Sequence, residues 1–273
     1  MKHSSRARIV NILVKEWRGT FSTLSTSLMV TLLPLLIVAQ VLVIIYLVVY
    51  LVPADALVSS ILGNGLSRLH ASMPELVVLS TSDQIQVYFL LQLPIYLLLI
   101  PMMVSNVLCT FSIVEEKQTR TLEPLLATPV RTWELLLAKA LAGTIPAMGM
   151  ALVSAGFALL GVVIMGSGSL LVFLLTPYWL VSLLLVTPLV TFLSFLLGII
   201  GSSRATDPRS AQVWVLPMVL PLLAWVAVQV LGYIPLTMSA LLVAALILAA
   251  AVGFLLWAAV LLFRRESILV HWR

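Results

Sequence analysis

The densest group of charged side chains in this chain is a short segment that we call the charged island, Glu115–Lys139. Carboxylates and cations at this density can pair with one another or with a docked protein. They do not form a catalytic set, because the chain has no HExxH motif and His3, His70 and His271 lie outside the apolar blocks. An enzyme that works inside a membrane is therefore poorly supported. The eight charges of the island are Glu115, Glu116, Lys117, Arg120, Glu123, Arg131, Glu134 and Lys139.

The composition excludes a soluble domain. The chain is 62% hydrophobic and only 9% charged, whereas soluble domains are about 25% charged. So much apolar surface can be accommodated only in lipid. The net charge of +5 is typical of a membrane protein with basic cytoplasmic loops and does not by itself indicate nucleic-acid binding. A single cysteine, Cys109, provides neither a disulfide framework nor a CxxC metal pattern.

The rest of the chain contains six apolar blocks, which determine where the island lies. Each block is long enough for a membrane-spanning helix of about 20 residues. Two long uncharged stretches each contain one break, at Gly166–Ser169 and at Gly232–Pro235, and therefore hold two spans each. We expect an all-α membrane protein with six transmembrane helices and an outer loop at 53–83. The predicted spans are 28–51, 85–114, 141–165, 170–200, 212–231 and 238–263.

The basic residues predict the orientation of these spans. All but one of the 15 Lys and Arg residues fall on one side of the predicted membrane, and the exception is Arg68 in the outer loop. By the positive-inside rule, both termini and the charged island at 115–139 are expected in the cytoplasm.

The segment at 6–27, before the first span, is predicted to be an amphipathic helix that lies in the membrane interface, an elbow helix. Basic and polar residues share one arc of the helix, and a Trp and aliphatic residues fill the other. Two interpretations remain open: the helix anchors the topology, or it also contacts a partner. The residues that we single out in it are Lys15, Glu16 and Trp17.

Glu16 lies at the edge of the apolar arc of this helix. A carboxylate in such a place needs a cationic partner, because an unpaired buried charge is costly. Arg120 and Arg131 of the charged island are the candidates that we expect for this partner.

The middle of the island predicts a short helix. Thr121 can cap its N-terminus, Pro124 is tolerated in the first turn, and Glu123 suits the positive end of the helix dipole. The leucines at 122, 125 and 126 then form one apolar ridge. A helix over residues 122–127 is only about 9 Å long and must pack on something. The lipid interface, the elbow helix and a groove in a cytosolic protein are the alternatives.

The island resembles the cytoplasmic coupling region of ABC-2 type transport permeases. The matching motifs are Glu115-Glu116-Lys117, Thr121-Leu122-Glu123-Pro124-Leu125-Leu126, Ala127-Thr128-Pro129 and Trp133-Glu134-Leu135-Leu136. The Lys15-Glu16 pair also matches the elbow helix of such proteins. The resemblance implies a single permease domain over residues 1–273, in which the short helix transmits ATP-driven motion to the spans. The residues that it assigns to this coupling are Glu115, Glu116, Lys117, Arg120, Thr121, Leu122, Glu123, Pro124, Leu125 and Leu126.

The resemblance also implies partners. The sequence has no GxxxxGK[ST] motif, so ATP and Mg²⁺ would bind a separate cytosolic ATPase subunit, and the chain itself would bind no cofactor or metal. Six spans are half of such a transporter, so a homodimer or heterodimer of permeases is expected. The expected location is the cytoplasmic membrane of a bacterium or archaeon, and the expected role is export. A non-export task, such as cofactor maturation, motility or ion extrusion, is the alternative.

Two polar stripes on the predicted second and fifth spans have two interpretations. They can join helices to one another, as polar residues commonly do in membranes, or they can line a substrate path. No ionisable residue lies in the span cores, which argues against a proton-coupled transporter. An uncharged path would suit an apolar or amphipathic substrate such as a drug, lipid or peptide. The candidate path residues are Tyr88, Gln92, Tyr96, Asn106, Trp214, Met218, Trp225 and Gln229.

Overall fold

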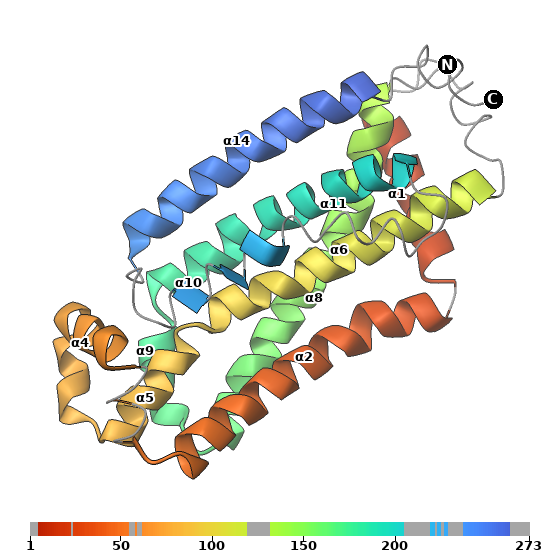
Figure 1. Ribbon diagram of the computed structural model, residues 1–273. Coiled ribbons are helices and arrows are strands. Elements are labelled where there is room, and N and C mark those ends of the chain that lie inside the picture. The colour runs from red at the N-terminus through yellow and green to blue at the C-terminus, as the bar shows by residue number, and fades with distance from the viewer. Residues whose placement is uncertain are drawn as a thin grey trace.

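The computed structural model describes residues 5–22, 24–54, 58, 62–118, 132–204, 219–221, 223–224, 227–228 and 237–262 (Figure 1). Over these residues every regular element is helical, which confirms the predicted all-α class. The elements are α1 (Ser5–Thr20), α2 (Leu24–Leu51), α4 (Gly63–Ser72), η2 (Pro74–Val78), α5 (Thr81–Leu90), α6 (Leu93–Gln118), α8 (Thr132–Ile164), η3 (Gly168–Leu170), α9 (Leu171–Leu174), α10 (Pro177–Val181), η4 (Ser182–Val186), α11 (Thr187–Arg204) and α14 (Met238–Leu262).

Four stretches of the described chain are long and apolar enough to cross a membrane: Thr26–Leu51, Glu134–Ile164, Pro177–Gly201 and Met238–Val260. They correspond to the first, third, fourth and sixth predicted spans. The second predicted span is divided between α5 and α6, and most of the fifth lies outside the described residues. The structure therefore bears out four of the six predicted spans.

Two boundaries differ from the prediction. The N-terminal helix α1 ends at Thr20, and residues 24–27, which we had placed in the interfacial helix, belong to α2. Helix α8 begins at Thr132, nine residues before the predicted span, so the last part of the charged island is already helical. A helix can start before the apolar run because its first turns need not be in lipid.

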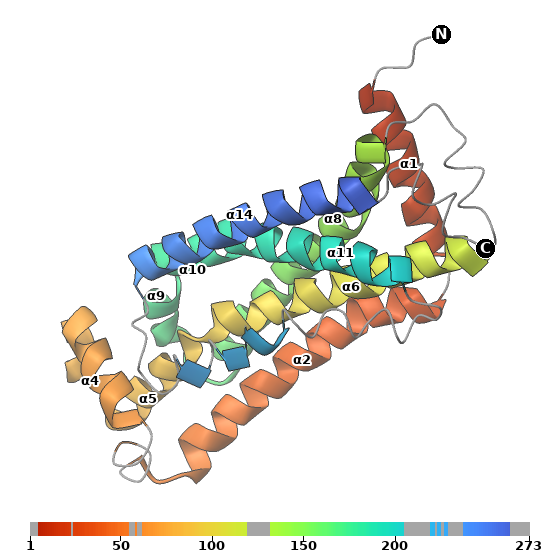
Figure 2. The ribbon, with the colours of Figure 1, turned by 45° about the horizontal axis from the view of Figure 1, so that its top comes forward.

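Helices α6, α8 and α11 pack together in the middle of the bundle, and α2 and α14 lie on opposite sides of them (Figures 1 and 2). The outer helices expose large apolar side chains, among them Leu36 on α2 and Leu246 on α14. Lipid can cover such side chains without the penalty that water would impose. The two helices thus present the apolar outside of the bundle.

Helices α6 and α11 run side by side in the same direction (Figure 1). The Ser105 hydroxyl donates to the Thr191 carbonyl at 3.0 Å, and the Ser194 hydroxyl donates to the Met102 carbonyl at 2.9 Å. Hydroxyls that bond across helices in this way are common in membranes. These two bonds fix the register of the pair.

Both the second and the fourth predicted spans are interrupted. The chain turns at Leu91 and Gln92 between α5 and α6, where Pro94 follows in the first turn of α6. The other interruption separates α9 from α10, just before Pro177. Proline lacks the N–H that continues a helix and restricts the residue before it, so both breaks have a local cause.

A small helical cap replaces the predicted outer loop. Helices α4, η2 and α5 close around one apolar cluster, which includes Leu66, Leu76 and Tyr88. The Ser80 hydroxyl accepts the backbone N–H of Asp83 at 3.2 Å and so caps α5. In both ribbon views this cap lies at one end of the molecule and α1 lies at the other (Figures 1 and 2).

Candidate coupling site

The end of α6 and the beginning of α8 form the two ends of the charged island, and both lie at the α1 end of the molecule (Figures 1 and 2). Glu115, Glu116 and Lys117 belong to the last turn of α6. The predicted coupling residues Arg120, Thr121, Leu122, Glu123, Pro124, Leu125 and Leu126 lie outside the described residues.

Two charges of the island are buried in the first part of α8. The exposed fraction is 0% for Glu134 and 4% for Lys139. Charged side chains are almost never fully buried unless they are paired, because they lose their hydration. The start of α8 therefore requires partners from elsewhere in the chain.

Glu16 of α1 is a partner of Lys139. The Lys139 Nζ and Glu16 Oε1 atoms are 3.1 Å apart, and the Glu16 side chain is only 11% exposed. The predicted need of Glu16 for a cation is confirmed by Lys139, which was not among the expected candidates; the expected Arg120 and Arg131 lie outside the described residues. Sequence reasoning overlooked the signal: Lys139 stands well inside an apolar helix, where it needs a carboxylate just as Glu16 needs a cation.

Trp17, the next residue of α1, makes a second contact with α8. Its indole N–H donates to the carbonyl of Ala142 at 2.8 Å. In a regular helix the N–H of residue 146 would bond this carbonyl, but that residue is Pro146 and has no N–H. Trp17 thus supplies the donor that Pro146 lacks. The carbonyl that the proline leaves without a helix bond is therefore satisfied by another helix.

The two contacts act on one face of α8. Lys139 and Ala142 are three residues apart and therefore neighbours on the helix surface, and they meet the adjacent residues Glu16 and Trp17. We call this pair of contacts the α1–α8 anchor. It joins α1 to the helix that contains the last part of the charged island.

The remaining surface of α1 is mixed. Lys15 is exposed, in keeping with the predicted polar arc, and Val10 and Val14 are exposed apolar residues one turn apart. A helix with an exposed apolar strip and exposed cations is typical of a membrane interface. The anchor side of α1 faces α8 and α6.

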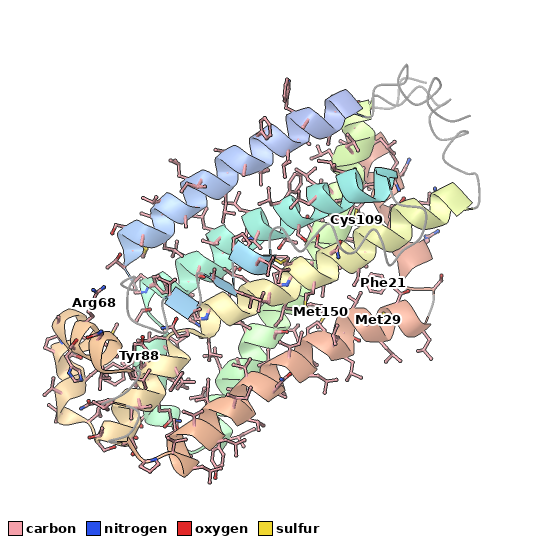
Figure 3. All side chains as sticks on the ribbon, viewed as in Figure 1. Phe21, Met29, Arg68, Tyr88, Cys109 and Met150 are labelled. Carbon is pink, nitrogen blue, oxygen red and sulfur yellow. The ribbon has the colours of Figure 1, made fainter. Side chains whose placement is uncertain are left out.

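The candidate path residues on α5 and α6 are not brought together. Tyr88 packs in the cap, where its hydroxyl lies against Gly65, and Figure 3 shows it at the α4 end. Asn106 is buried near Gly198 of α11, at the level of Cys109. Gln92 is completely buried at the α5–α6 break. The side chain of Tyr96, and all of Trp214, Met218, Trp225 and Gln229, lie outside the described residues.

These contacts favour a packing role for Tyr88 and Asn106. A Cβ atom on Gly198 would stand 3.0 Å from Cys109 Sγ and 3.4 Å from Asn106 Oδ1, so α6 and α11 approach closely here. Within the described ranges, no three His, Cys, Asp or Glu side chains group as a metal site would require. The described chemistry at the α1 end is ion pairing and hydrogen bonding between helices.

A sequence model of the ABC-2 family transporter protein matches residues 69–206, slightly more than half of the chain. The match runs from α4 into the residues after α11, so it includes the charged island and both helices that flank it. Helix α1 lies before the matched region, whereas Lys139 and Ala142 lie inside it. No curated protein and no solved structure gives a significant match.

Proposed function

Because this chain belongs to the ABC-2 transporter family and is a membrane permease of an ABC transporter, we propose that it is the membrane subunit of an ATP-driven exporter. The family is a transport component and not a catalytic enzyme. A separate cytosolic ATPase would bind ATP and Mg²⁺ and drive the permease. A second permease, identical or different, would complete the path.

The α1–α8 anchor is the observation that carries the coupling proposal. Helix α8 begins inside the island at Thr132, six residues after Leu126, and its buried Lys139 and its Ala142 carbonyl hold Glu16 and Trp17 of α1. A force applied to the island would therefore move α8 and α1 together. In this proposal the ridge Leu122, Leu125 and Leu126 docks on the ATPase, on the cytoplasmic side of the membrane.

We infer the substrate class from the lack of charge at the centres of the spans, since Glu134 and Lys139 lie in the first turns of α8. None of the four long apolar stretches presents a pair of opposite charges at its centre that could neutralise an ion. We propose an apolar or amphipathic substrate, such as a drug, lipid or peptide, and a path along the fifth-span stripe Trp214, Met218, Trp225 and Gln229. The membrane would be that of a bacterial or archaeal cell.

The test is association with a candidate cytosolic ABC ATPase from the same organism. Leu125→Asp places a charge on the docking ridge and should abolish co-purification of the ATPase while leaving membrane insertion intact. Val78→Asp is the matched control, because Val78 is an exposed aliphatic residue in the cap at the opposite end. Normal co-purification with Leu125→Asp would overturn the docking proposal.

The same complex distinguishes export from the alternative task. An exporter's ATP hydrolysis should rise when candidate substrates are added to the complex in nanodiscs. A permease-like subunit that serves cofactor maturation or motility should couple to the ATPase but show no such stimulation.

A further inference from the structure

Six buried polar side chains have an atom without a hydrogen-bond partner among the described residues, namely those of Gln92, Asn106, Thr144, Ser154, Trp179 and Ser182. Three of the six, Gln92, Trp179 and Ser182, belong to the α5–α6 break and to the stretch α10–η4. Gln92 and Ser182 are fully buried, and Trp179 is 4% exposed. Both amide atoms of Gln92, the indole Nε1 of Trp179 and the hydroxyl of Ser182 are unpaired. A buried polar group without a partner is costly, and most such groups in proteins prove to be bonded to protein or to ordered water.

Gln92 and Ser182 lie at the same level of the bundle. The bonds Ser105–Thr191 and Ser194–Met102 fix the register of the parallel helices α6 and α11. The midpoint of the two bonds lies between Met102 and Ser105 on α6 and between Thr191 and Ser194 on α11. At a rise of 1.5 Å per residue, Gln92 is about 17 Å from this midpoint in the direction of α6, and Ser182 is about 16 Å from it in the direction of α11.

The packing agrees with this register. Leu93, which follows Gln92, shares one buried cluster with Trp179 and with Leu183, which follows Ser182. The α6 helix also contacts the η4 turn directly. The register and the α6–η4 contact therefore place Gln92 and Ser182 at one level of the bundle, and Trp179 stands three residues before Ser182.

Both helices are irregular at this level. Gln92 lies in the break between α5 and α6, and Ser182 begins the π-helical turn η4. The Ser182 carbonyl accepts both the backbone N–H of Thr187, a π-type bond, and the Thr187 hydroxyl at 3.1 Å. Pro94 offers no N–H to the Leu90 carbonyl. In membrane helices such freed groups are satisfied by side chains or by ordered water, and π-turns often mark functional sites.

The chemistry of these three side chains indicates which kind of ligand they could bind. An amide and a hydroxyl can each donate and accept, an indole N–H can donate, and none of the three is charged. The surrounding residues are apolar, Leu90, Leu97 and Leu174 among them, so an ion would lose its hydration with no counter-charge. A small neutral molecule that both donates and accepts fits, and water has these properties.

We propose that Gln92, Trp179 and Ser182 form a buried water-binding site between the α5–α6 break and the η4 turn. Bound water would bond the amide, the indole and the hydroxyl together. The proposal of this site depends only on burial and register. A failure of the proposals on ATPase coupling and on the substrate would therefore not affect it.

Pulsed X-ray radiolysis tests this site, because hydroxyl radicals form from bound water and label the side chains beside it. The full-length chain would be irradiated in phosphatidylethanolamine–phosphatidylglycerol nanodiscs, and labelling would be read by peptide mass spectrometry. Trp179 should be labelled several-fold faster than the equally buried Phe195, which lies in an apolar cluster, after correction for ring reactivity. Equal corrected rates would overturn the proposal.

Variants show whether the label depends on the named groups. Gln92→Leu should lower the labelling of Trp179 several-fold and leave Phe195 unchanged. Gln86→Leu is the matched control, because the buried Gln86 amide already donates to Ser167. Ser182→Ala should also lower the labelling of Trp179. If Gln92→Leu does not fold, Ser182→Ala alone tests the site. Labelling of Trp179 that neither variant reduces would contradict the site.

Discussion

Lys139 of α8 and Glu16 of α1 form an ion pair in which Nζ and Oε1 are 3.1 Å apart and both side chains are almost removed from solvent. The two residues are 123 positions apart in the sequence. A buried pair of this kind contributes little net stability when intact, because desolvation offsets attraction, but the loss of one partner is severe. The pair therefore fixes where α1 sits on α8.

Glu16→Gln should destabilise the folded chain by about 3 to 5 kcal/mol, because it removes this carboxylate from the buried Lys139. Unfolding in mixed detergent micelles would measure the change. The double variant Glu16→Gln/Lys139→Met should recover most of the loss, since no charge then remains buried at this contact. Arg18→Gln, at an exposed position of the same helix, serves as control and should be close to neutral. Equal stability of Glu16→Gln and the unmutated chain would contradict the role of the pair.

Trp17→Phe keeps an aromatic ring but removes the donor to the Ala142 carbonyl. The expected cost is about 1 to 3 kcal/mol, the penalty for a buried acceptor that loses its bond. In a Pro146→Ala background the backbone N–H of residue 146 can take over this carbonyl, so Trp17→Phe should cost clearly less there. A double-mutant cycle on the two positions measures the difference, and strict additivity would argue against the proposed compensation.

Gly198→Ala should weaken the contact between α6 and α11. The new Cβ would stand 3.1 Å from the Cβ and 3.0 Å from the Sγ of Cys109, so the helices must separate slightly. Overpacking of this kind costs about 1 to 3 kcal/mol. Gly253→Ala on α14 is the control, because open space surrounds that position, and it should be neutral or slightly stabilising. Comparison of thermal unfolding of the two variants checks the prediction.

Trp225→Ala should change which compounds stimulate ATP hydrolysis by the complex, if the fifth-span stripe lines the path as proposed. Tyr88→Phe is the comparison, because Tyr88 packs within the cap and should leave the compound profile unchanged. An unaltered profile for Trp225→Ala would assign that stripe to packing.

The sequence predicted the helices better than their partners. Length and apolarity suffice to locate α2, α8 and α14, because lipid leaves a spanning segment no alternative to a helix. The effect of a proline was harder to predict. Pro146 stays inside an unbroken helix, and the carbonyl that it leaves without its helix bond accepts the N–H of Trp17, whereas Pro94 follows a break. Which outcome occurs depends on a contact from a distant helix that no local pattern contains.

The same limit explains the candidate site. The edge position of Glu16 predicted that it needs a cation, but the identity of the cation depends on how α1 crosses α8. The α5–α6 break at Gln92 likewise separates Tyr88 from Asn106, which a continuous helical wheel had placed on one face. A turn of only two residues is enough to redirect everything that follows it.

The α1–α8 anchor also sets an order of events during synthesis. Glu16 and Trp17 leave the ribosome 123 residues or more before the α8 residues that they contact. At about 5 to 20 residues per second, the delay is about 6 to 25 s. Throughout that time α1 has neither contact, so it has to wait at the membrane surface with Glu16 hydrated while the first two apolar segments insert. The arrival of α8 then completes the N-terminal end of the protein, so the beginning of the chain reaches its final place only after about half of the chain has been made.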